Sequence, residues 1–133
     1  MKELRVIIAG SREFDDFPKL MNSCIDILSS ITNKNDGLDK IRIVSGAARG
    51  ADRLGEQYAK IASYEVSRFP ADWDGLGKRA GYIRNAEMAK FVVADGNYGV
   101  LIAFWDGKSK GTKHMINLAE KYGLEVHIVR FEK

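Results

Sequence analysis

The sequence predicts a single Rossmann-like, doubly wound α/β domain, in which a mostly parallel sheet of about five strands carries helices on both faces. Three observations predict this fold class. Short β-branched runs alternate along the chain with longer segments of helical spacing. Glycine and small polar residues follow most of the predicted strands. The sequence contains no internal repeat, low-complexity tract or linker, and 133 residues suffice for one hydrophobic core. We therefore expect one domain over residues 1–133.

Residues 4–9 are predicted to form the first strand, because they are a short apolar run, rich in β-branched residues, that ends at Gly10. A helix is predicted to follow, beginning at the aspartates and proline of residues 15–18 and ending in the turn residues 33–37. The apolar residues of this helix recur at helical spacing: Leu20, Cys24, Ile27, Leu28 and Ile31.

The rest of the chain continues the alternation. Further strands are predicted at residues 41–44, 64–69, 100–104 and 126–129. Helices are predicted at residues 51–63, 77–94 and 112–122, the second weakened by Gly81 and the third ended by Gly123. The resulting order, βαβαβαβαβ, predicts a parallel sheet whose strands are joined by right-handed crossovers through helices.

Composition and charge exclude several classes of protein. Hydrophobic residues make up 45% of the chain and charged residues 29%, which is typical of a globular protein and not of a disordered one. The net charge of +3 suits an anionic small molecule as well as a nucleic acid. Cys24 is the only cysteine, so no intrachain disulfide forms, and no apolar run is long enough for a signal peptide or membrane span. A cytoplasmic location is the resulting expectation.

Ligands of open parallel sheets bind outside the carboxyl ends of the strands, so the segments after the strands are the candidate site. Gly10, Ser11 and Arg12 follow the first strand. Glycine lets a ligand approach the backbone, the serine hydroxyl donates a hydrogen bond, and arginine binds phosphate bidentately. A plain turn with a solvated arginine is the alternative for this triplet.

The second strand is followed by a glycine-bearing loop, residues 45–52, that enters a helix. A helix N-terminus presents free N–H groups and partial positive charge, which suit a phosphate. The loop matches neither the Walker A motif nor the dinucleotide fingerprint. Asp52 is interpreted either as a first-turn acid that complements the helix dipole or as an acceptor for a ribose hydroxyl. The phosphate-binding candidates here are Ser45, Gly46, Arg49 and Gly50.

The segment after the third strand and the helix that follows it supply further candidates. Asp72 and Trp73 follow that strand, and the indole ring is placed either to stack on a base or to cover the core. Lys78 and Asn85 share one face of the next helix. Arg84 lies about 100° from Asn85 around that helix, so both are expected to reach one site only near a helix end or bend.

A second glycine-bearing loop, residues 106–112, follows the fourth strand and again enters a helix. Two such loops and Arg12 at the same edge of the sheet predict one phosphate-binding pocket. No metal site is predicted, because His114 has no second histidine near it in the sequence. The candidates in this loop are Asp106, Ser109, Gly111 and Thr112.

Together, these motifs resemble the YspA-like branch of the SLOG superfamily, which is related to the Smf/DprA and Lonely Guy proteins. The resemblance rests on residues 8–12, 44–52, 69–73, 83–88 and 104–112 and covers nearly the whole chain. It implies a Rossmann-like fold with a pocket for nucleotides or nucleotide-derived signals, in a branch with many bacterial or phage members.

The resemblance also bears on catalysis. Lonely Guy enzymes, which cleave the base from a nucleoside monophosphate, carry the motif Pro-Gly-Gly-x-Gly-Thr-x-x-Glu. Gly111 and Thr112 match its Gly-Thr, but Met115 stands at the position of the glutamate. A thioether cannot act as an acid or a base, so the resemblance implies binding rather than hydrolysis. The remaining catalytic candidates are Arg84, Glu87 and Asp106.

Three functions are therefore weighed. The first is a sensor or binding module for a nucleotide or a nucleotide-derived ligand, such as an ADP-ribose or NAD-related signal. The alternative is a nucleotide N-glycosidase or phosphoribohydrolase of Lonely Guy type. The second alternative is single-stranded DNA binding of DprA type, against which the acids interspersed among the basic residues count. The expected partner is a nucleotide-type small molecule and not a membrane; the cofactor is unidentified and a homo-oligomer stays open.

Overall fold

β1 (Lys2–Gly10) lies at the centre of a five-stranded sheet in the computed structural model, which describes residues 2–132. The other strands are β2 (Leu38–Ser45), β3 (Glu65–Arg68), β4 (Tyr98–Trp105) and β5 (Glu125–Arg130). All neighbouring strands pair in parallel, in the order β3-β2-β1-β4-β5. This arrangement confirms the predicted α/β class and the parallel sheet of about five strands.

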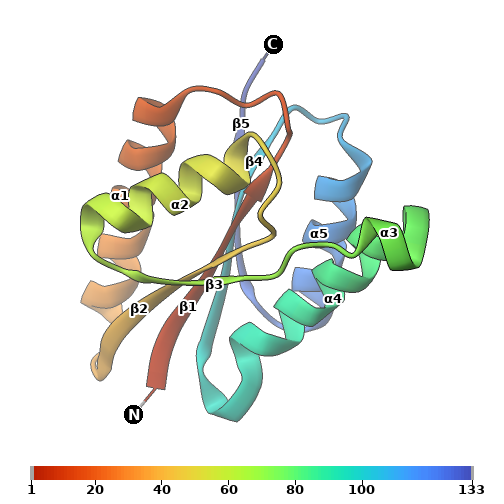
Figure 1. Cartoon of the computed structure of the whole chain (residues 1–133). Coiled ribbons are helices and arrows are strands. Elements are labelled where there is room, and N and C mark those ends of the chain that lie inside the picture. Colours follow the sequence, from red (N-terminus) through yellow and green to blue (C-terminus); the bar gives the residue numbers. More distant parts are fainter. Residues whose placement is uncertain (1, 133) are drawn as a thin grey trace.

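Helices cover both faces of the sheet (Figure 1). On one face lie α1 (Phe17–Lys34) and α2 (Ala51–Ala62), and on the other lie α4 (Ala80–Val93) and α5 (Lys110–Lys121). The alternation of side chains along each strand divides the core accordingly. In β1, Val6 and Ile8 pack with α1 and α2, whereas Ile7 and Ala9 pack with α4 and α5. The near-continuous apolar strands follow from this burial on two faces.

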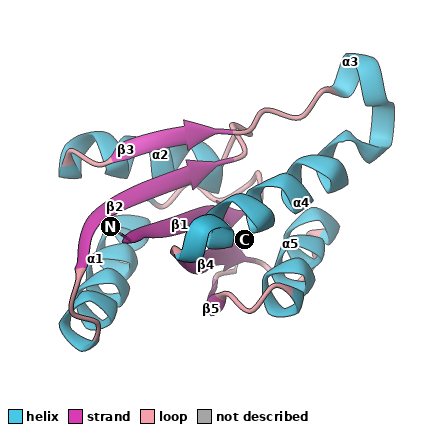
Figure 2. Ribbon diagram, turned by 90° about the horizontal axis from the view of Figure 1, so that it is seen from below, coloured by secondary structure: helices cyan, strands magenta, loops and turns pink. Residues whose placement is uncertain are grey.

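The helix predicted over residues 77–94 is present as α4, but its first three residues form a 3-10 turn, and a short helix that was not predicted stands before it. A short helix α3 (Trp73–Leu76) and a 3-10 turn η1 (Gly77–Arg79) precede α4, and a second 3-10 turn η2 (Ala94–Gly96) follows it. Asp72 caps α3 by accepting a hydrogen bond from the amide of Gly75 at 2.9 Å. Gly77, with a φ of +63°, then redirects the chain. Figure 2 shows α3 standing away from the sheet at the end of α4.

The strand order places a topological switch point between β1 and β4. The chain leaves β1 toward α1 on one face of the sheet and leaves β4 toward α5 on the other. The two loops therefore diverge at the carboxyl edge and leave a crevice between them, which is where ligands bind in this class of fold. Within residues 2–132, no helix has the length and apolarity required to cross a membrane.

The packing of α2 on β1 depends on Gly55. A Cβ at Gly55 would lie 2.7 Å from Cγ2 of Ile8, much closer than a normal van der Waals contact. Gly111, in the first turn of α5, has no atom within 4 Å of the corresponding position. Alanine substitutions at these two helical glycines therefore distinguish the effect of steric packing on stability from the effect of helix propensity.

We expect Gly55→Ala to lower the free energy of unfolding by about 1–3 kcal/mol, because the added methyl group overpacks the contact with Ile8. Gly111→Ala should raise it by up to about 1 kcal/mol, because alanine favours the helix and meets no neighbour. Chemical denaturation of the two variants measures both changes. Shifts of the same sign and size in both would contradict this account of the α2 packing.

Candidate functional site

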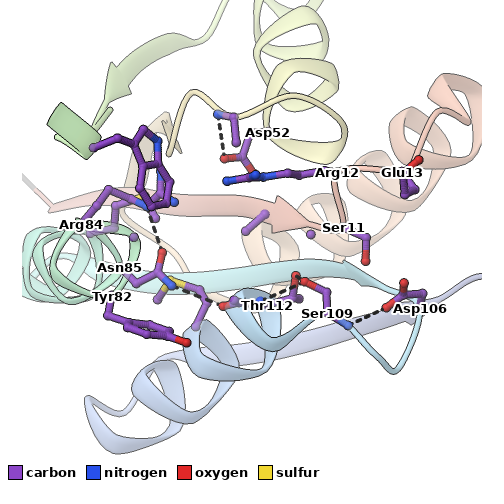
Figure 3. Close-up of a pocket in the computed structure, with 18 of the residues that line it drawn as sticks. Ser11, Arg12, Glu13, Asp52, Tyr82, Arg84, Asn85, Asp106, Ser109 and Thr112 are labelled. Carbon is purple, nitrogen blue, oxygen red and sulfur yellow. Dashed lines mark hydrogen bonds between the residues drawn. The ribbon is translucent and has the colours of Figure 1, made fainter. Parts of the chain in front are cut away.

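A pocket of about 400 Å³ opens at the carboxyl edge of the sheet, beside the ends of β1 and β4 (Figure 3). The loops after these strands form its walls together with the first turns of α4 and α5 and the start of α2. The pocket therefore occupies the switch point of the fold.

Most residues predicted from the sequence as ligand-binding come together along this pocket: Gly10, Ser11, Arg12, Asp52, Trp73, Lys78, Arg84, Asn85, Asp106, Ser109, Gly111 and Thr112. Other predicted residues do not line it: Ser45, Gly46, Arg49, Gly50, Asp72 and Glu87. The loop after β2 thus reaches the pocket through Ala48 and Asp52 instead of through its glycines.

The loop after β1 presents Ser11 and Arg12 to the pocket because Gly10 lets the backbone pass close to β4. A Cβ at Gly10 would lie 2.2 Å from the carbonyl oxygen of Phe104, which accepts a hydrogen bond from the Ser11 amide at 3.0 Å. The Ser11 hydroxyl is buried and lacks a hydrogen-bond partner among residues 2–132. It is near enough to help lower the pKa of Asp106, although the geometry falls short of a hydrogen bond. Buried hydroxyls are normally bonded, so Ser11 is prepared for an external partner.

The loop after β2 offers few free hydrogen-bond donors to a phosphate, because two of its backbone amides already donate to its own side chains. The amide of Ala47 donates to the Ser45 hydroxyl at 3.0 Å, and the amide of Ala48 donates to Asp52 Oδ2 at 3.2 Å. The Ser45 hydroxyl in turn donates to Glu56 Oε2 at 2.6 Å. These bonds argue against the phosphate-binding role predicted for Ser45 and assign it to the architecture of the loop.

Two glycines of the same loop act as spacers behind the pocket. A Cβ at Gly50 would lie 2.5 Å from the carbonyl oxygen of Ser11. A Cβ at Gly46 would lie 2.6 Å from Nη1 of Arg84 and 2.8 Å from Oδ2 of Asp52. Both positions bring other segments together instead of meeting the pocket themselves.

Arg84 and Asn85 both line the pocket although they are neighbours on α4. Nη1 of Arg84 donates to the carbonyl oxygen of Gly46 at 2.5 Å, and Nε donates to Oδ1 of Asn85 at 3.0 Å. The two residues lie near the N-terminal end of α4, as expected from the sequence, and the length of the arginine side chain lets both reach the pocket. Nδ2 of Asn85 donates to the carbonyl oxygen of Gly111 at 3.3 Å and lies 3.1 Å from Nδ1 of His114. Asn85 thus links Arg84 to α5.

Asp52 places a buried carboxyl group in the pocket, with 6% of its surface exposed. Burial raises the pKa of Asp52 to about 6, against the opposing effects of the Ala48 amide and of the Arg84 and Arg12 guanidinium groups. The same burial lowers the pKa of Arg84. The pocket therefore contains an acid that changes its charge near pH 6.

Asp106 organises the loop after β4. The amides of Lys108 and Ser109 donate to Asp106 Oδ1 at 2.8 Å and 2.9 Å, which lowers the pKa of that carboxyl group. Ser109 is the N-cap of α5. The next two amides, those of Lys110 and Gly111, have no acceptor within the described part of the chain. Free amides at a helix N-terminus suit an anion.

Two aromatic side chains, Trp73 and Tyr82, stand at the mouth of the pocket, each about half exposed. Trp73 packs on Gly81, where a Cβ would lie 3.2 Å from the indole ring, and the Arg12 guanidinium lies 5.7 Å from the ring centroid. Tyr82 packs edge-on against His114, with 4.4 Å between ring centroids. The mouth thus offers aromatic surface beside cationic groups.

The pocket also includes residues outside the set predicted as ligand-binding: Ala9, Glu13, Ala48, Gly81, Tyr82, Met88 and Met115. Helical spacing carries a signal for four of them: on the predicted helices, Gly81 and Tyr82 lie three and four residues after Lys78, Met88 lies three residues after Asn85, and Met115 lies three residues after Thr112. Glu13 had no such signal in the sequence; its Oε1 pairs with Nη2 of the exposed Arg49 at 3.3 Å. Among the side chains that the structure describes, no three His, Cys, Asp or Glu residues are grouped to hold a metal ion.

Comparison with known proteins gives two matches. The family model described as "YspA, cpYpsA-related SLOG family" matches residues 4–75, which run from β1 to α3. Gene 61 protein of Mycobacterium phage D29 is 35% identical over 127 residues, which cover 92% of this chain and 93% of that protein. No solved structure matches the chain significantly.

Asp52→Asn should make stability less dependent on pH. The native state holds the Asp52 proton up to about pH 6, whereas the unfolded chain releases it near 3.8. The unfolded state therefore binds fewer protons between these values, and the native protein loses stability as the pH rises through this window. We expect the variant to gain up to about 3 kcal/mol relative to the wild type between pH 4 and pH 7, measured by denaturation.

Asp106→Asn is the matched control, and its stability difference from the wild type should stay nearly constant between pH 4 and pH 7, because Asp106 titrates below this window. Its carboxylate is stabilised in the native state, so its contribution is lost as the pH falls through the lowered pKa. The other carboxyl groups titrate alike in the variants and in the wild type. Their contributions therefore cancel when the free energy of unfolding of a variant is compared with that of the wild type. A constant stability difference between Asp52→Asn and the wild type from pH 4 to pH 7 would contradict the buried state of Asp52.

Proposed function

The chain belongs to the YspA, cpYpsA-related SLOG family, and from this premise we propose that residues 1–133 act as one binding domain for a nucleotide or nucleotide-derived ligand, such as an ADP-ribose or NAD-related signal. The ligand occupies the pocket at the carboxyl edge of the sheet. The protein acts as a sensor or binding module. A cytoplasmic location is part of the proposal, supported by a single, buried cysteine.

One observation carries the proposal: the buried, unpartnered hydroxyl of Ser11 faces a pocket that also exposes free amides at the start of α5. A hydroxyl donor, helix N-terminal amides and nearby guanidinium groups are the chemistry that proteins use for phosphate. In this proposal, Ser11, Arg12, Gly111 and Thr112 contact phosphate oxygens.

The other end of the pocket suits the ribose and base. Met88 and Met115 supply buried apolar surface, and Trp73 and Tyr82 supply aromatic faces at the mouth. Stacking on an aromatic ring accepts any base, so the aromatic pair supports a nucleotide-type ligand without choosing among bases. Asn85 acts in this proposal by positioning Arg84, because its amide is already bonded to α4 and α5.

Binding is favoured over hydrolysis because Met115 lines the pocket where the resemblance to Lonely Guy enzymes implies a glutamate. A thioether neither donates nor accepts a catalytic proton. The other predicted catalytic carboxylates are poorly placed: Glu87 does not line the pocket, and Asp106 accepts two amides of its own loop. The ligand should therefore leave the pocket chemically intact.

A thermal-shift screen of nucleotides, NAD and ADP-ribose tests the binding function, with mass spectrometry of each mixture to detect cleavage. At least one member is expected to raise the melting temperature, because a ligand that binds only the native state stabilises it by mass action. The mass of that ligand should not change. Release of a free base or a ribose phosphate would make the protein an enzyme, and the absence of any shift across the panel would contradict the nucleotide function.

Arg12→Ala should weaken the ligand found in that screen about tenfold to a hundredfold, because it removes a charge-assisted contact to phosphate. Arg79→Ala is the matched control: Arg79 is exposed and has no side-chain partner in the described chain. Arg49→Ala should have a smaller effect than Arg12→Ala because Arg49 does not line the pocket and is paired with Glu13. Isothermal titration measures the three affinities, and equal losses for Arg12→Ala and Arg79→Ala would refute the role of Arg12.

A further inference from the structure

Three charged side chains from different elements meet at one wall of the pocket. Arg12 comes from the loop after β1, Arg84 from α4, and Asp52 from α2. Figure 3 shows Arg12 extending toward Asp52. Arg84 and Asp52 both border Gly46: a Cβ there would lie 2.6 Å from Nη1 of Arg84 and 2.8 Å from Oδ2 of Asp52. The three groups are close enough to influence one another's charge.

The carboxyl group at this wall is not neutralised by a direct ion pair. Neither arginine lies within ion-pairing distance of Asp52, whose hydrogen bond within the described chain comes from the Ala48 amide at 3.2 Å. Arg84 is instead held by the Gly46 carbonyl and by Asn85, and Arg12 lies over the Trp73 ring. Two guanidinium groups and a buried carboxyl group thus share a space that opens to the pocket.

We propose that the ligand places an anionic group between Arg12 and Arg84 and against Asp52, and that Asp52 takes up one proton when it does so. This inference rests on the proposed binding function and adds to it an anion contact at Arg84 and Asp52, beyond the phosphate contacts proposed at Ser11, Arg12 and the start of α5, and the coupling of binding to protons. Protonated Asp52 donates a hydrogen bond to an oxygen of the anion, and the two guanidinium groups balance its charge.

Proton uptake follows from the charges that face Asp52. An anion at this wall adds negative charge beside a carboxyl group that burial already makes difficult to ionise. Arg12 and Arg84 oppose this effect from the β1 loop and from α4, whereas Glu56 adds to it from α2 itself. Of the other charged groups in the lining, Glu13 is paired with Arg49, Asp106 accepts two amides of its own loop, and Lys78 comes from η1. The incoming anion therefore raises the pKa of Asp52 further than burial does alone, and protonation of Asp52 removes the repulsion between the carboxylate and the anion.

A ribose hydroxyl at Asp52, the role considered from the sequence, makes the opposite prediction. Hydroxyl groups donate to an ionised carboxylate, so binding would then release a proton and strengthen as the pH rises. Replacing the carboxylate by an amide would weaken it. The sign of the pH dependence therefore distinguishes an anion at Asp52 from a sugar.

Sulfate is a suitable probe because its own charge is constant between pH 5 and pH 7.5. We expect its affinity for the wild-type protein, measured by calorimetric titration, to fall about tenfold over this range, which corresponds to one unit of change in the pKa of one group. Titrations in buffers of different ionisation enthalpy should show proton uptake on binding. Affinity that rises with pH, that does not change with pH, or that is absent would overturn the proposal.

Two variants identify the titrating group. Asp52→Asn should bind sulfate at pH 7.5 about as tightly as the wild type does at pH 5, with no remaining pH dependence. His114→Gln should keep the wild-type pH dependence, because His114 contacts Asn85 but does not line the pocket. Loss of the dependence in His114→Gln and not in Asp52→Asn would refute the role of Asp52. If Asp52→Asn fails to fold, the proton uptake of the wild type decides the matter.

The same titrations separate this inference from the binding function. Sulfate that binds with proton uptake, in a protein that binds no nucleotide, would uphold the anion position and remove the nucleotide function. Nucleotide binding together with pH-independent sulfate binding would uphold the nucleotide function and overturn the proposed role of Asp52.

Discussion

The close approach of three chain segments at the carboxyl end of β1 is the constraint on which the pocket depends. The loop after β1 passes against the carbonyl group of Phe104 at Gly10 and is met from behind by Gly50, at the start of α2. Any side chain at either position would collide with backbone atoms, and backbone cannot move aside as a flexible side chain can. This packing turns Ser11 and Arg12 toward the crevice between β1 and β4, where the strand order of the sheet directs ligands.

The same packing holds charged groups together in a restricted volume. The cationic side chains of the lining are matched in number by acidic ones: Arg12, Lys78 and Arg84 against Glu13, Asp52 and Asp106. Such a balance does not favour a ligand by net charge, so recognition must come from directed hydrogen bonds and from changes in protonation. Keeping Asp52 buried costs stability near neutral pH, and proteins commonly accept such a cost at the sites where they bind ligands.

Strand and helix periodicity were enough to predict the sheet, because strands buried on two faces and helices with one apolar stripe leave plain patterns in the sequence. The prediction that Arg12 and residues 106–112 lie at the same edge of the sheet required only the order of strands and helices. Contacts between distant segments left no such pattern. The bond from Arg84 to the Gly46 carbonyl, the pairing of Glu13 with Arg49 and the amides closed off by Ser45 and Asp52 depend on side-chain geometry that spacing does not encode. The short helix α3 was missed because Asp72 and Gly77, which cap it, act locally on a segment of four residues.

The most direct test of the central claim is a ¹H–¹⁵N nuclear magnetic resonance titration of the protein with ADP-ribose. If the ligand binds at the switch point, the largest shifts will appear at the amides of Arg12, Glu13, Lys110 and Gly111, which line or border the pocket and have no acceptor in the described chain. Smaller shifts should follow at Ala48 and at the indole of Trp73. Shifts confined to another surface, such as the one formed by Lys19 and Arg130, or no shifts at all, would contradict the assignment of this pocket as the nucleotide site.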